Sequence, residues 1–332
     1  MKRVLSGIRA NSDLTLGNYL GALKPWVELQ SAAVAEDIEY FFFIPNLHSI
    51  AARIDPVDLR RRTLSNAALY LAAGLDPAKV TFYVQSQVPA HAELCWIFNN
   101  YVTVGELSRM TQYKDKTAKS GAEGQLASIF NYPILMAADI LLYSANEVPV
   151  GNDQRQHVEL ARDIANRFNN LYGPTFTLPK ATHPEAGARI MNLQNPASKM
   201  SKSDDDSSGN IMLTDSPELI RQKLSRAVTD SGSEIKAAKD KPAVSNLLEI
   251  FSAITGRGVS ELEQAYAGKG YAEFKTDLAE AVVEHLEPIQ HRHDELMSDE
   301  RELLALLEDG RQKAGAIAEE KLSQVKQTIG LL

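Results

Sequence analysis

The sequence predicts an α/β fold, in which a doubly wound parallel sheet is followed by an α-helical C-terminal domain. Short apolar runs in the first part of the chain have the length and composition of buried strands. The segments between these runs have the periodicity of amphipathic helices. Strands that alternate with helices form βαβ units, which build parallel sheets. Beyond about residue 205 the periodicity is helical up to the end of the chain, which predicts the second domain.

The elements of the sheet follow one another without long gaps. We expect strands over residues 4–8, 40–44 and 80–85, helices over residues 17–33 and 60–73, and a further helix after Pro89. Ligands of doubly wound sheets bind at the carboxyl ends of the strands. The residues that lie there are Gly7, residues 46–48 and residues 85–87.

From Gly105 onwards the pattern is mostly helical. We expect helices over residues 132–143 and 153–168, with residues 148–150 as a short strand between them and a Lys/Ser/Gly-rich loop over residues 114–124. A loop rich in Asp, Ser and Gly over residues 204–209 leads to helical segments that include residues 218–227 and 281–293. We therefore place a domain boundary near residue 205, with a helical insertion at about residues 105–130.

Composition excludes several classes of protein. The chain has 332 residues, of which 44% are hydrophobic, and this suits one large domain with a smaller one. Its net charge of −8 argues against a protein that coats nucleic acid through bulk electrostatics. Cys95 is the only cysteine, so neither an intrachain disulfide nor a cysteine metal cluster can form, and a cytoplasmic location is expected. No signal peptide is recognised, and the longest apolar run, interrupted by Asp139, is too short to span a membrane.

The most informative stretch is Ser-Lys-Met-Ser-Lys-Ser-Asp at residues 198–204. Two lysines flanked by hydroxyls in a loop can surround a polyphosphate and release it, although a solvated charged loop is the commoner interpretation of such a stretch. Gly17 and Asn18 follow the first strand, where a helix N-terminus offers amides to a phosphate. A helix start capped by Thr15 explains them equally well. The two stretches together predict a nucleotide site.

These stretches resemble the two signatures of class I aminoacyl-tRNA synthetases, His-Ile-Gly-His and Lys-Met-Ser-Lys-Ser. The second is complete at residues 199–203, and the first appears as Thr-Leu-Gly-Asn at residues 15–18. The Thr and Asn in place of histidines are similar to the tryptophanyl-tRNA synthetase branch. Other stretches similar to that branch cover nearly the whole chain: residues 88–93, 105–107, 109–112, 132–133, 136–143, 148–151, 153–157, 187–191 and 227–231.

The resemblance implies the activity and the partners. It implies a Rossmann-like catalytic domain over residues 1–205, a helical tRNA anticodon-binding domain over residues 206–332, and a homodimer. The implied enzyme is a tryptophan–tRNA ligase, which activates L-tryptophan with ATP and Mg²⁺ and then charges tRNA(Trp). The implied catalytic residues are Thr15, Asn18, Lys199, Ser201 and Lys202, with Lys202 the first choice for the transition-state contact. The implied ATP site comprises Arg9, Ala10, Asn11, Gly17, Asn18, Gly151, Asn152, Asp153, Ile190, Lys199, Met200, Ser201, Lys202 and Ser203.

The resemblance also implies a tryptophan pocket, and one of its residues can be argued physically. Asp139 shares a helix face with Tyr132, Met136 and Tyr143, so its carboxylate is expected inside an aromatic and thioether lining, where it accepts the indole N–H. A buried, otherwise unpaired carboxylate rejects a substrate that lacks the donor. An exposed or helix-capping aspartate is the alternative. The other implied residues are Tyr132, Met136, Val148, Val150, Gln154, Leu5, Gly7 and His48, of which His48 alone could also be a structural histidine.

Some positions leave alternatives open. Asp153 suits either a ribose acceptor or a helix N-cap, and Lys114 and Lys116 suit either the pyrophosphate or solvent. Residues 94–101 could belong to a dimer interface or to the core. The basic residues proposed to contact tRNA are equally typical of a solvated face: Lys223, Arg226, Arg311, Lys313, Lys321 and Lys326.

The chain also departs from the family pattern. Ala-Asn-Ser at residues 10–12 replaces the usual Pro-Ser/Thr-Gly, Arg9 replaces a frequent Gln, and Asn46 and Asn152 replace frequent acidic residues. We expect retained activity, because the lysine loop and Asp139 are intact. The altered loop motivates one rival, a catalytically silent paralogue that senses tryptophan or tRNA. A tyrosyl-tRNA synthetase is the second rival, and a nucleotidyltransferase of cofactor biosynthesis, which lacks the long helical C-terminal part, is the third.

Overall fold

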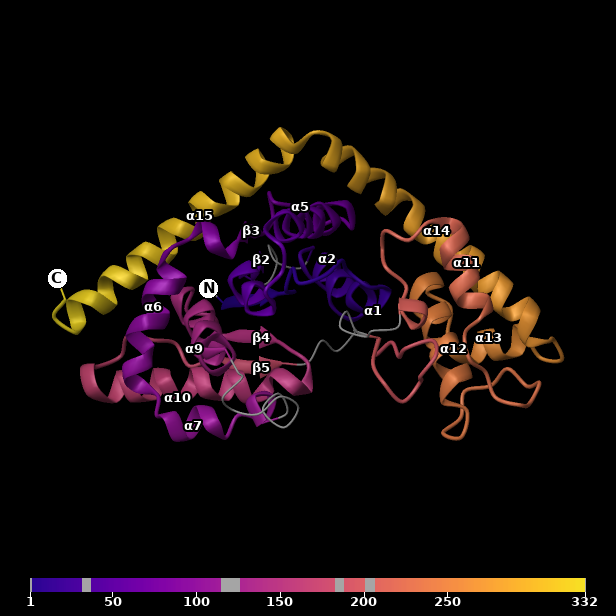
Figure 1. Ribbon diagram of the computed structural model, residues 1–332, viewed down its shortest axis with the longest axis horizontal. Coiled ribbons are helices and arrows are strands. Elements are labelled where there is room, and N and C mark those ends of the chain that lie inside the picture. Colours follow the sequence, from indigo (N-terminus) through magenta and orange to yellow (C-terminus); the bar gives the residue numbers. More distant parts are fainter. Residues whose placement is uncertain (1, 32–36, 115–125, 183–187, 201–206, 332) are drawn as a thin grey trace.

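The computed structural model describes residues 2–31, 37–114, 126–182, 188–200 and 207–331 (Figure 1). Its sheet has five parallel strands in the order β3-β2-β1-β4-β5. The strands are β1 (Lys2–Gly7), β2 (Ile38–Ile44), β3 (Thr81–Val84), β4 (Glu147–Pro149) and β5 (Lys180–Thr182). The predicted doubly wound sheet is thus confirmed, and its strand order reverses at β1, between β2 and β4. Such a reversal is the point at which a doubly wound sheet opens a crevice for a ligand.

The aromatic run of β2 shows why both faces of the sheet are covered. Successive side chains of a strand point to opposite faces. Tyr40 and Phe42 accordingly belong to one hydrophobic core, and Phe41 and Phe43 belong to another. All four are nearly inaccessible to solvent. A continuous apolar run is therefore typical of a strand with helices on both sides, as the sequence predicted.

The helices that flank the sheet follow the predicted order, with shifted ends. Helix α5 begins at Pro56 rather than near residue 60, because the Asp55 side chain accepts from the amides of Val57 and Asp58 and caps the helix. The elements are α1 (Leu16–Asn18), the π-helical turn η1 (Tyr19–Leu23), α2 (Lys24–Leu29), α4 (Asn46–Ser49), η2 (Ile50–Ala52), α5 (Pro56–Ala72), η3 (Gln85–Gln87), α6 (Ala90–Phe98), η4 (Asn99–Tyr101), α7 (Val104–Ser108), α9 (Ala127–Leu142), η5 (Asn152–Gln154) and α10 (Arg155–Tyr172).

The C-terminal part is helical, as predicted, but its last helix returns to the sheet. The elements are η6 (Ser207–Gly209), α11 (Pro217–Ser225), α12 (Pro242–Thr255), α13 (Val259–Ala265), α14 (Tyr271–Ser298) and α15 (Glu300–Thr328). Helix α14 packs on α11, α12 and α5, whereas α15 packs on β3, α6 and α9. Figure 1 shows the two long helices as an arch over both lobes. The predicted domain boundary falls in residues 201–206, outside the described residues.

One glycine permits the contact between α15 and the sheet. A side chain at Gly310 would place its Cβ 1.6 Å from the carbonyl oxygen of Phe82 in β3. Only a residue without a Cβ allows a helix backbone to approach a strand backbone this closely. Among the described helices, none is both long and apolar enough to cross a membrane.

Candidate active site

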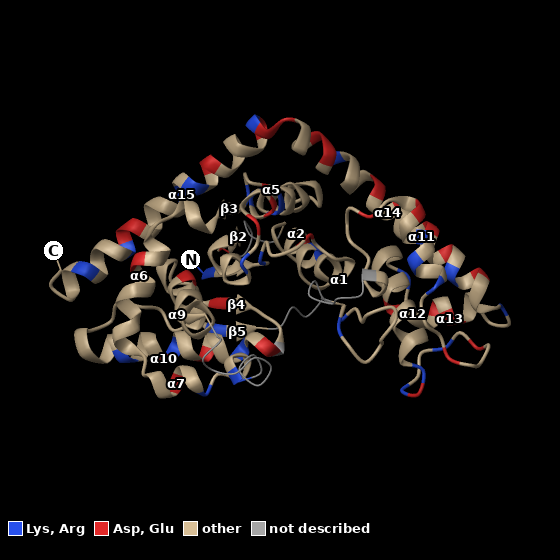
Figure 2. Cartoon of the chain, in the orientation of Figure 1, with Lys and Arg blue, Asp and Glu red and all other residues tan. Residues whose placement is uncertain are grey.

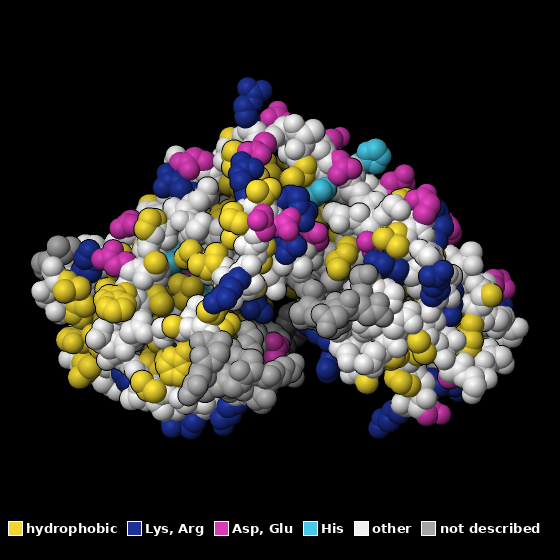
Figure 3. All heavy atoms as spheres, viewed as in Figure 1, with side chains coloured by type: hydrophobic (Ala, Val, Ile, Leu, Met, Phe, Trp, Pro, Cys, Tyr) yellow, Lys and Arg dark blue, Asp and Glu magenta, His cyan; other side chains and the backbone are white. Residues whose placement is uncertain are grey.

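A cavity of about 800 Å³ lies where the strand order reverses. Its lining includes Gly7 at the end of β1, Pro149 at the end of β4 and His48 in the helix after β2. The opposite wall comes from Gly17 and Lys199. In Figure 3 the surface is hollowed between the sheet lobe and the helical lobe. The cavity is therefore at the position that the fold predicts for a ligand.

Asp139 lies in α9 at one side of this cavity and is almost completely buried, with 1% of its surface exposed. Its Oδ2 atom lies 2.8 Å from His48 Nε2. Its Oδ1 atom lies 2.6 Å from His91 Nδ1 and accepts a hydrogen bond of 2.7 Å from Gln85 Nε2. The alternative of an exposed or capping aspartate is thereby excluded. The predicted absence of other partners was wrong, because residues from α4, η3 and α6 converge on the carboxylate.

These contacts keep Asp139 ionised. Burial alone would raise the pKa of its carboxyl group, but the hydrogen bonds from His48 and His91 outweigh burial and lower the pKa to about 2. An ionised carboxylate only accepts hydrogen bonds, so each histidine nitrogen that faces it carries the proton. A carboxylate has about four acceptor positions. Three protein donors leave one position for a ligand.

A second group of polar side chains surrounds Tyr132, which lies about two turns before Asp139 in α9. Its hydroxyl donates to Gln112 Oε1 at 2.7 Å and lies 2.6 Å from His157 Nε2. Burial lowers the pKa of His157 to about 4, so the ring is neutral near pH 7. Since the hydroxyl proton faces Gln112, the His157 proton faces the tyrosine oxygen. Both Tyr132 and Gln112 line the cavity, and they present oriented dipoles to it.

The first signature stretch forms a capped helix start. Thr15 is the N-cap of α1: its hydroxyl accepts from the Asn18 amide, and Asn18 Oδ1 accepts from the Thr15 amide at 3.1 Å. The Leu16 amide donates to the carbonyl of Ile211. Our expectation of free amides at this helix start was thus wrong for Leu16 and Asn18. Gly17 and Asn18 still line the cavity, whereas Thr15 is fully buried.

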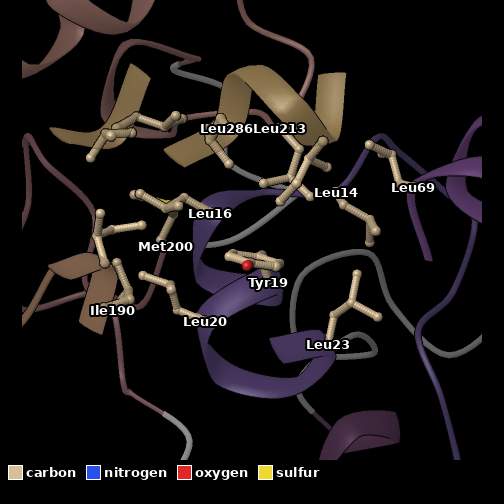
Figure 4. Close-up of a cluster of buried hydrophobic side chains, with 14 of the residues drawn as sticks. Leu14, Leu16, Tyr19, Leu20, Leu23, Leu69, Ile190, Met200, Leu213 and Leu286 are labelled. Atoms are coloured by element: carbon tan, nitrogen blue, oxygen red, sulfur yellow. The ribbon is translucent and has the colours of Figure 1, made fainter. Parts of the chain in front are cut away.

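The start of the lysine loop packs directly on this helix. A Cβ at Gly17 would lie 3.2 Å from the Cβ of Met200, so the missing side chain brings the two signatures together. Met200 donates its amide to the carbonyl of Ile190, and both side chains are buried. Figure 4 shows them pointing into one apolar cluster with Leu16 and Leu20 of the signature segment and with Leu213 and Leu286 of the helical part. This cluster holds Lys199 at the cavity wall.

The predicted site residues can now be placed. All nine that were predicted for tryptophan line the cavity: Leu5, Gly7, His48, Tyr132, Met136, Asp139, Val148, Val150 and Gln154. Of those predicted for ATP, Arg9, Gly17, Asn18, Gly151, Asp153 and Lys199 line it. Ala10, Ile190 and Met200 are buried behind the wall, and the carbonyl of Asn11 accepts from Arg62. Ser201, Lys202, Ser203 and Lys116 lie outside the described residues, as does the side chain of Asn152.

The structure also decides the role of Asp153 in the fold. Gln154, not Asp153, is the N-cap residue of α10. The carboxylate of Asp153 instead accepts from Gln154 Nε2 at 2.8 Å and is exposed at the cavity. The helix-cap alternative for Asp153 is therefore wrong.

Several residues at the site had no predicted role. Gln112, Trp26 and Arg189 line the cavity, and Gln85 and His91 bind Asp139 from behind it. Gln112 and His91 belong to stretches already recognised as similar to the synthetase branch, and Gln85 is the last residue of a predicted strand. No other feature of the sequence indicated roles for these three residues, because their contacts with Asp139 and Tyr132 join segments that are far apart in the chain.

Comparisons with known proteins agree with this geometry. The family model described as tRNA synthetases class I (W and Y) matches residues 1–287. A tryptophan–tRNA ligase from Clostridium tetani is 48% identical over 331 residues, which are 100% of this chain and 96% of the relative. Another from Leifsonia xyli subsp. xyli is 50% identical over 332 residues, with 99% of this chain and 97% of the relative covered. The chain belongs to the tryptophanyl-tRNA synthetase family.

Solved structures of this family have the same fold. The crystal structure of tryptophanyl-tRNA synthetase from Mycoplasma pneumoniae aligns with a TM-score of 0.88 at 35% identity, over 99% of this chain and 98% of that one. The Campylobacter jejuni tryptophanyl-tRNA synthetase complexed with ADP and tryptophan aligns with a TM-score of 0.85 at 37% identity, over 99% of each chain. The class I synthetase fold of this family member extends through α14 and α15, since the alignments cover almost the entire chain.

Proposed function

We propose that this chain is an active tryptophan–tRNA ligase, which forms tryptophanyl-adenylate from L-tryptophan and ATP and then transfers the tryptophan to tRNA(Trp). One observation carries the proposal: a single cavity joins the two signature segments, at Gly17 and Lys199, to the buried acceptor Asp139. The signature end suits a nucleotide, and the Asp139 end suits an indole. The family relationship points to the same reaction.

The indole end explains the choice of amino acid. Tryptophan would place its N–H at the remaining acceptor position of Asp139, with Met136 and Val148 against the ring. Tyr132 would accept from the substrate ammonium group, because its own proton is directed to Gln112. An amino acid without the indole N–H would leave a buried carboxylate short of a donor, which polar sites reject strongly.

In the activation step, the tryptophan carboxylate attacks the α-phosphorus of ATP, and pyrophosphate leaves. The protein supplies no nucleophile. Its contribution is to hold the two substrates in line and to stabilise the charge that develops on the leaving pyrophosphate. We assign this second role to Lys199, which lies at the cavity wall, and to Lys202 and Ser201 of the same motif. Arg9, Gly151 and Asp153 would hold the remainder of ATP.

Magnesium is proposed as the metal ion that accompanies ATP. This ion usually binds through substrate phosphates and one or two carboxylates, and it neutralises charge on the phosphates. Within the described ranges, no three His, Cys, Asp or Glu side chains are grouped as metal ligands. Because Mg²⁺ binds mainly through substrate phosphates, we expect the ion to enter with ATP, beside Asp153 and Lys199.

The second step requires tRNA(Trp). Because the reaction uses this tRNA, we propose that the protein acts in the cytoplasm. The helical lobe would bind the tRNA, but the basic residues suggested from sequence receive little support. Figure 2 shows acidic residues among the basic ones along α14 and α15. Lys223 is buried against Asp215, and Arg311, Lys313 and Lys326 are paired with acidic neighbours.

We also propose a homodimer. Four apolar side chains on α6, α7 and α10 are exposed, and Figure 1 shows these three helices at the same end of the molecule. They are Trp96, Val104, Leu171 and Tyr172, with exposed fractions of 75%, 72%, 67% and 44%. Large apolar side chains exposed together at one end of a molecule are typical of a protein interface. For residues 94–101, where interface and core were both open, Leu94 and Phe98 belong to the core, whereas Trp96 is exposed.

The test is amino-acid-dependent exchange of pyrophosphate into ATP, with purified protein and Mg²⁺ and with tryptophan, tyrosine and phenylalanine in parallel. We expect exchange with tryptophan alone. Exchange driven by tyrosine would overturn the role of Asp139, and no exchange with any of the three would favour a silent paralogue. Asp139→Asn should raise the KM for tryptophan and leave the KM for ATP nearly unchanged, because Asp139 lies at the indole end of the cavity and not at the signature end proposed for ATP.

A further inference from the structure

His91 is the buried residue whose surroundings are least explained by a role in packing alone. It lies in α6 with none of its surface exposed, and both ring nitrogens have partners. Nδ1 lies 2.6 Å from Asp139 Oδ1, and Nε2 lies 3.0 Å from the hydroxyl of Tyr143. The hydroxyl of Tyr83 is 3.4 Å from the same Nε2. An apolar side chain would fill this volume without burying so many polar atoms. Since burial of polar atoms is costly, packing alone does not account for a histidine at this position.

The two oxygens of Asp139 are used in different ways. Oδ1 receives His91 and Gln85, which are both fully buried. Oδ2 receives only His48, and His48 lines the cavity. Because Oδ1 has both of its acceptor positions filled, the position that remains open belongs to Oδ2, on the cavity side. The protein donors therefore select which oxygen is offered to a ligand.

Tyr143 fixes the direction of the His91 contact. In a neutral imidazole one nitrogen donates and the other accepts. Donation from the Tyr143 hydroxyl to Nε2 places the single ring proton on Nδ1, where it faces Asp139. The partner of one ring nitrogen thus sets the role of the other, as in many catalytic and metal-bound histidines. Burial raises the pKa of the Tyr143 hydroxyl, so it retains the proton that it donates.

We propose that His91 is a positioning residue for tryptophan recognition, which holds Oδ1 of Asp139 from behind the cavity so that Oδ2 is oriented to accept the indole N–H. This inference rests on the proposed function and adds a residue that does not touch the substrate. Its effect is specific, because it acts only through the one hydrogen bond that Asp139 makes to the ligand.

Two amide variants separate this role from simple packing. In His91→Asn the amide nitrogen takes the place of Nδ1, so the donor to Asp139 is kept. In His91→Gln the amide lies one methylene further out, near the place of Nε2, and that donor is displaced. We expect His91→Gln to raise the KM for tryptophan in ATP–pyrophosphate exchange about tenfold or more, as for loss of a hydrogen bond to a charged group. His91→Asn should stay within about threefold, and the KM for ATP should not change in either variant.

A tryptophan analogue gives a second readout. In 3-benzothienylalanine a sulfur atom replaces the indole N–H, so the analogue cannot donate to Asp139. We expect His91→Gln to weaken binding of tryptophan and to leave the inhibition constant of the analogue within about twofold of wild type. A structural defect would weaken both ligands alike, and that result would overturn the inference. Equal effects of the Asn and Gln variants on the tryptophan KM would do so as well.

Folding of the variants is checked by circular dichroism. Should His91→Gln not fold, Tyr143→Phe replaces it, because this change removes the hydroxyl that orients the His91 proton and leaves the ring in place. The same selective rise in the tryptophan KM is then expected, and an unchanged KM would count against the inference. Failure of the proposed function looks different, since wild-type protein would then show no tryptophan-dependent exchange at all.

Discussion

The contact between α15 and the sheet leads to a sharp prediction about two glycines of one helix. Gly310 is buried against the backbone of Phe82, whereas a Cβ at Gly315 meets nothing within 4 Å. Both residues are in the interior of α15, so alanine improves helix propensity equally at both, by about 1 kcal/mol. Only the surroundings differ. The pair Gly310→Ala and Gly315→Ala therefore isolates the packing of α15 on β3.

The size of the effect follows from the distances. A methyl group at Gly310 would lie 1.6 Å from the Phe82 oxygen and 2.6 Å from its carbonyl carbon, where ordinary contacts begin at 3.4 Å. The obstacle is backbone, so no rotamer change relieves it and the helix must retreat. Overpacking of this kind costs roughly 3 kcal/mol. After the gain in propensity, we expect Gly310→Ala to lower the free energy of unfolding by roughly 2 kcal/mol and Gly315→Ala to raise it by about 1 kcal/mol.

Equilibrium unfolding in urea, followed by far-UV circular dichroism, measures the difference. Thermal midpoints of the two variants should differ by roughly 6 °C or more, at about 2 °C per kcal/mol for a protein of this size. The Gly310 variant should also bind tryptophan more weakly, because β3 leads directly into Gln85, a partner of Asp139. Equal stabilisation of both variants would show that α15 does not pack on β3 through Gly310.

Two further predictions concern buried charge. Lys223→Met should lower the free energy of unfolding in urea by about 3 kcal/mol, because it leaves Asp215 buried without the lysine that lies 2.6 Å away. Arg221→Ala is the control on the same helix. It breaks an exposed ion pair with Glu280 and should lower the free energy of unfolding by no more than about 1 kcal/mol. Similar losses in both variants would contradict this. For His157, burial lowers the pKa from 6.5 to about 4, so between these values the unfolded chain binds a proton that the folded chain does not, and stability falls as pH falls. Wild type should lose about 2 kcal/mol more than His157→Asn between pH 7 and pH 5; equal pH dependence in the two proteins would refute the assignment.

The local sequence was sufficient to predict a strand or helix where the residue pattern repeats with the period of that element. The aromatic run at residues 40–44 predicted a strand buried on both faces, and the core assignments of Tyr40 to Phe43 agree. Element ends were less accurate, since they depend on caps such as Asp55. Strand β5 was missed because Lys-Ala-Thr has no apolar run, and its place in the sheet comes from pairing with β4.

Asp139 shows which features of the site could be predicted from the sequence and which could not. Its spacing from Tyr132 and Met136 placed it on a lined helix face, and all three line the cavity. Its partners could not be predicted in the same way. His48 and His91 are 91 and 48 residues away in the chain, on separate elements, and the sequence alone suggested a carboxylate without partners.

The sequence by itself thus determined four of the five strands, the helical C-terminal part, the two signature stretches and the nine residues predicted for tryptophan that line the cavity, because each depends on residue type and on spacing within one element. Tertiary structure alone decided that α15 returns to β3, that Gly17 packs on Met200, and that His91 and Gln85 occupy one oxygen of Asp139. These features depend on contacts between distant segments. Such contacts are set by how closely whole elements can pack and by the need of every buried polar group for a partner.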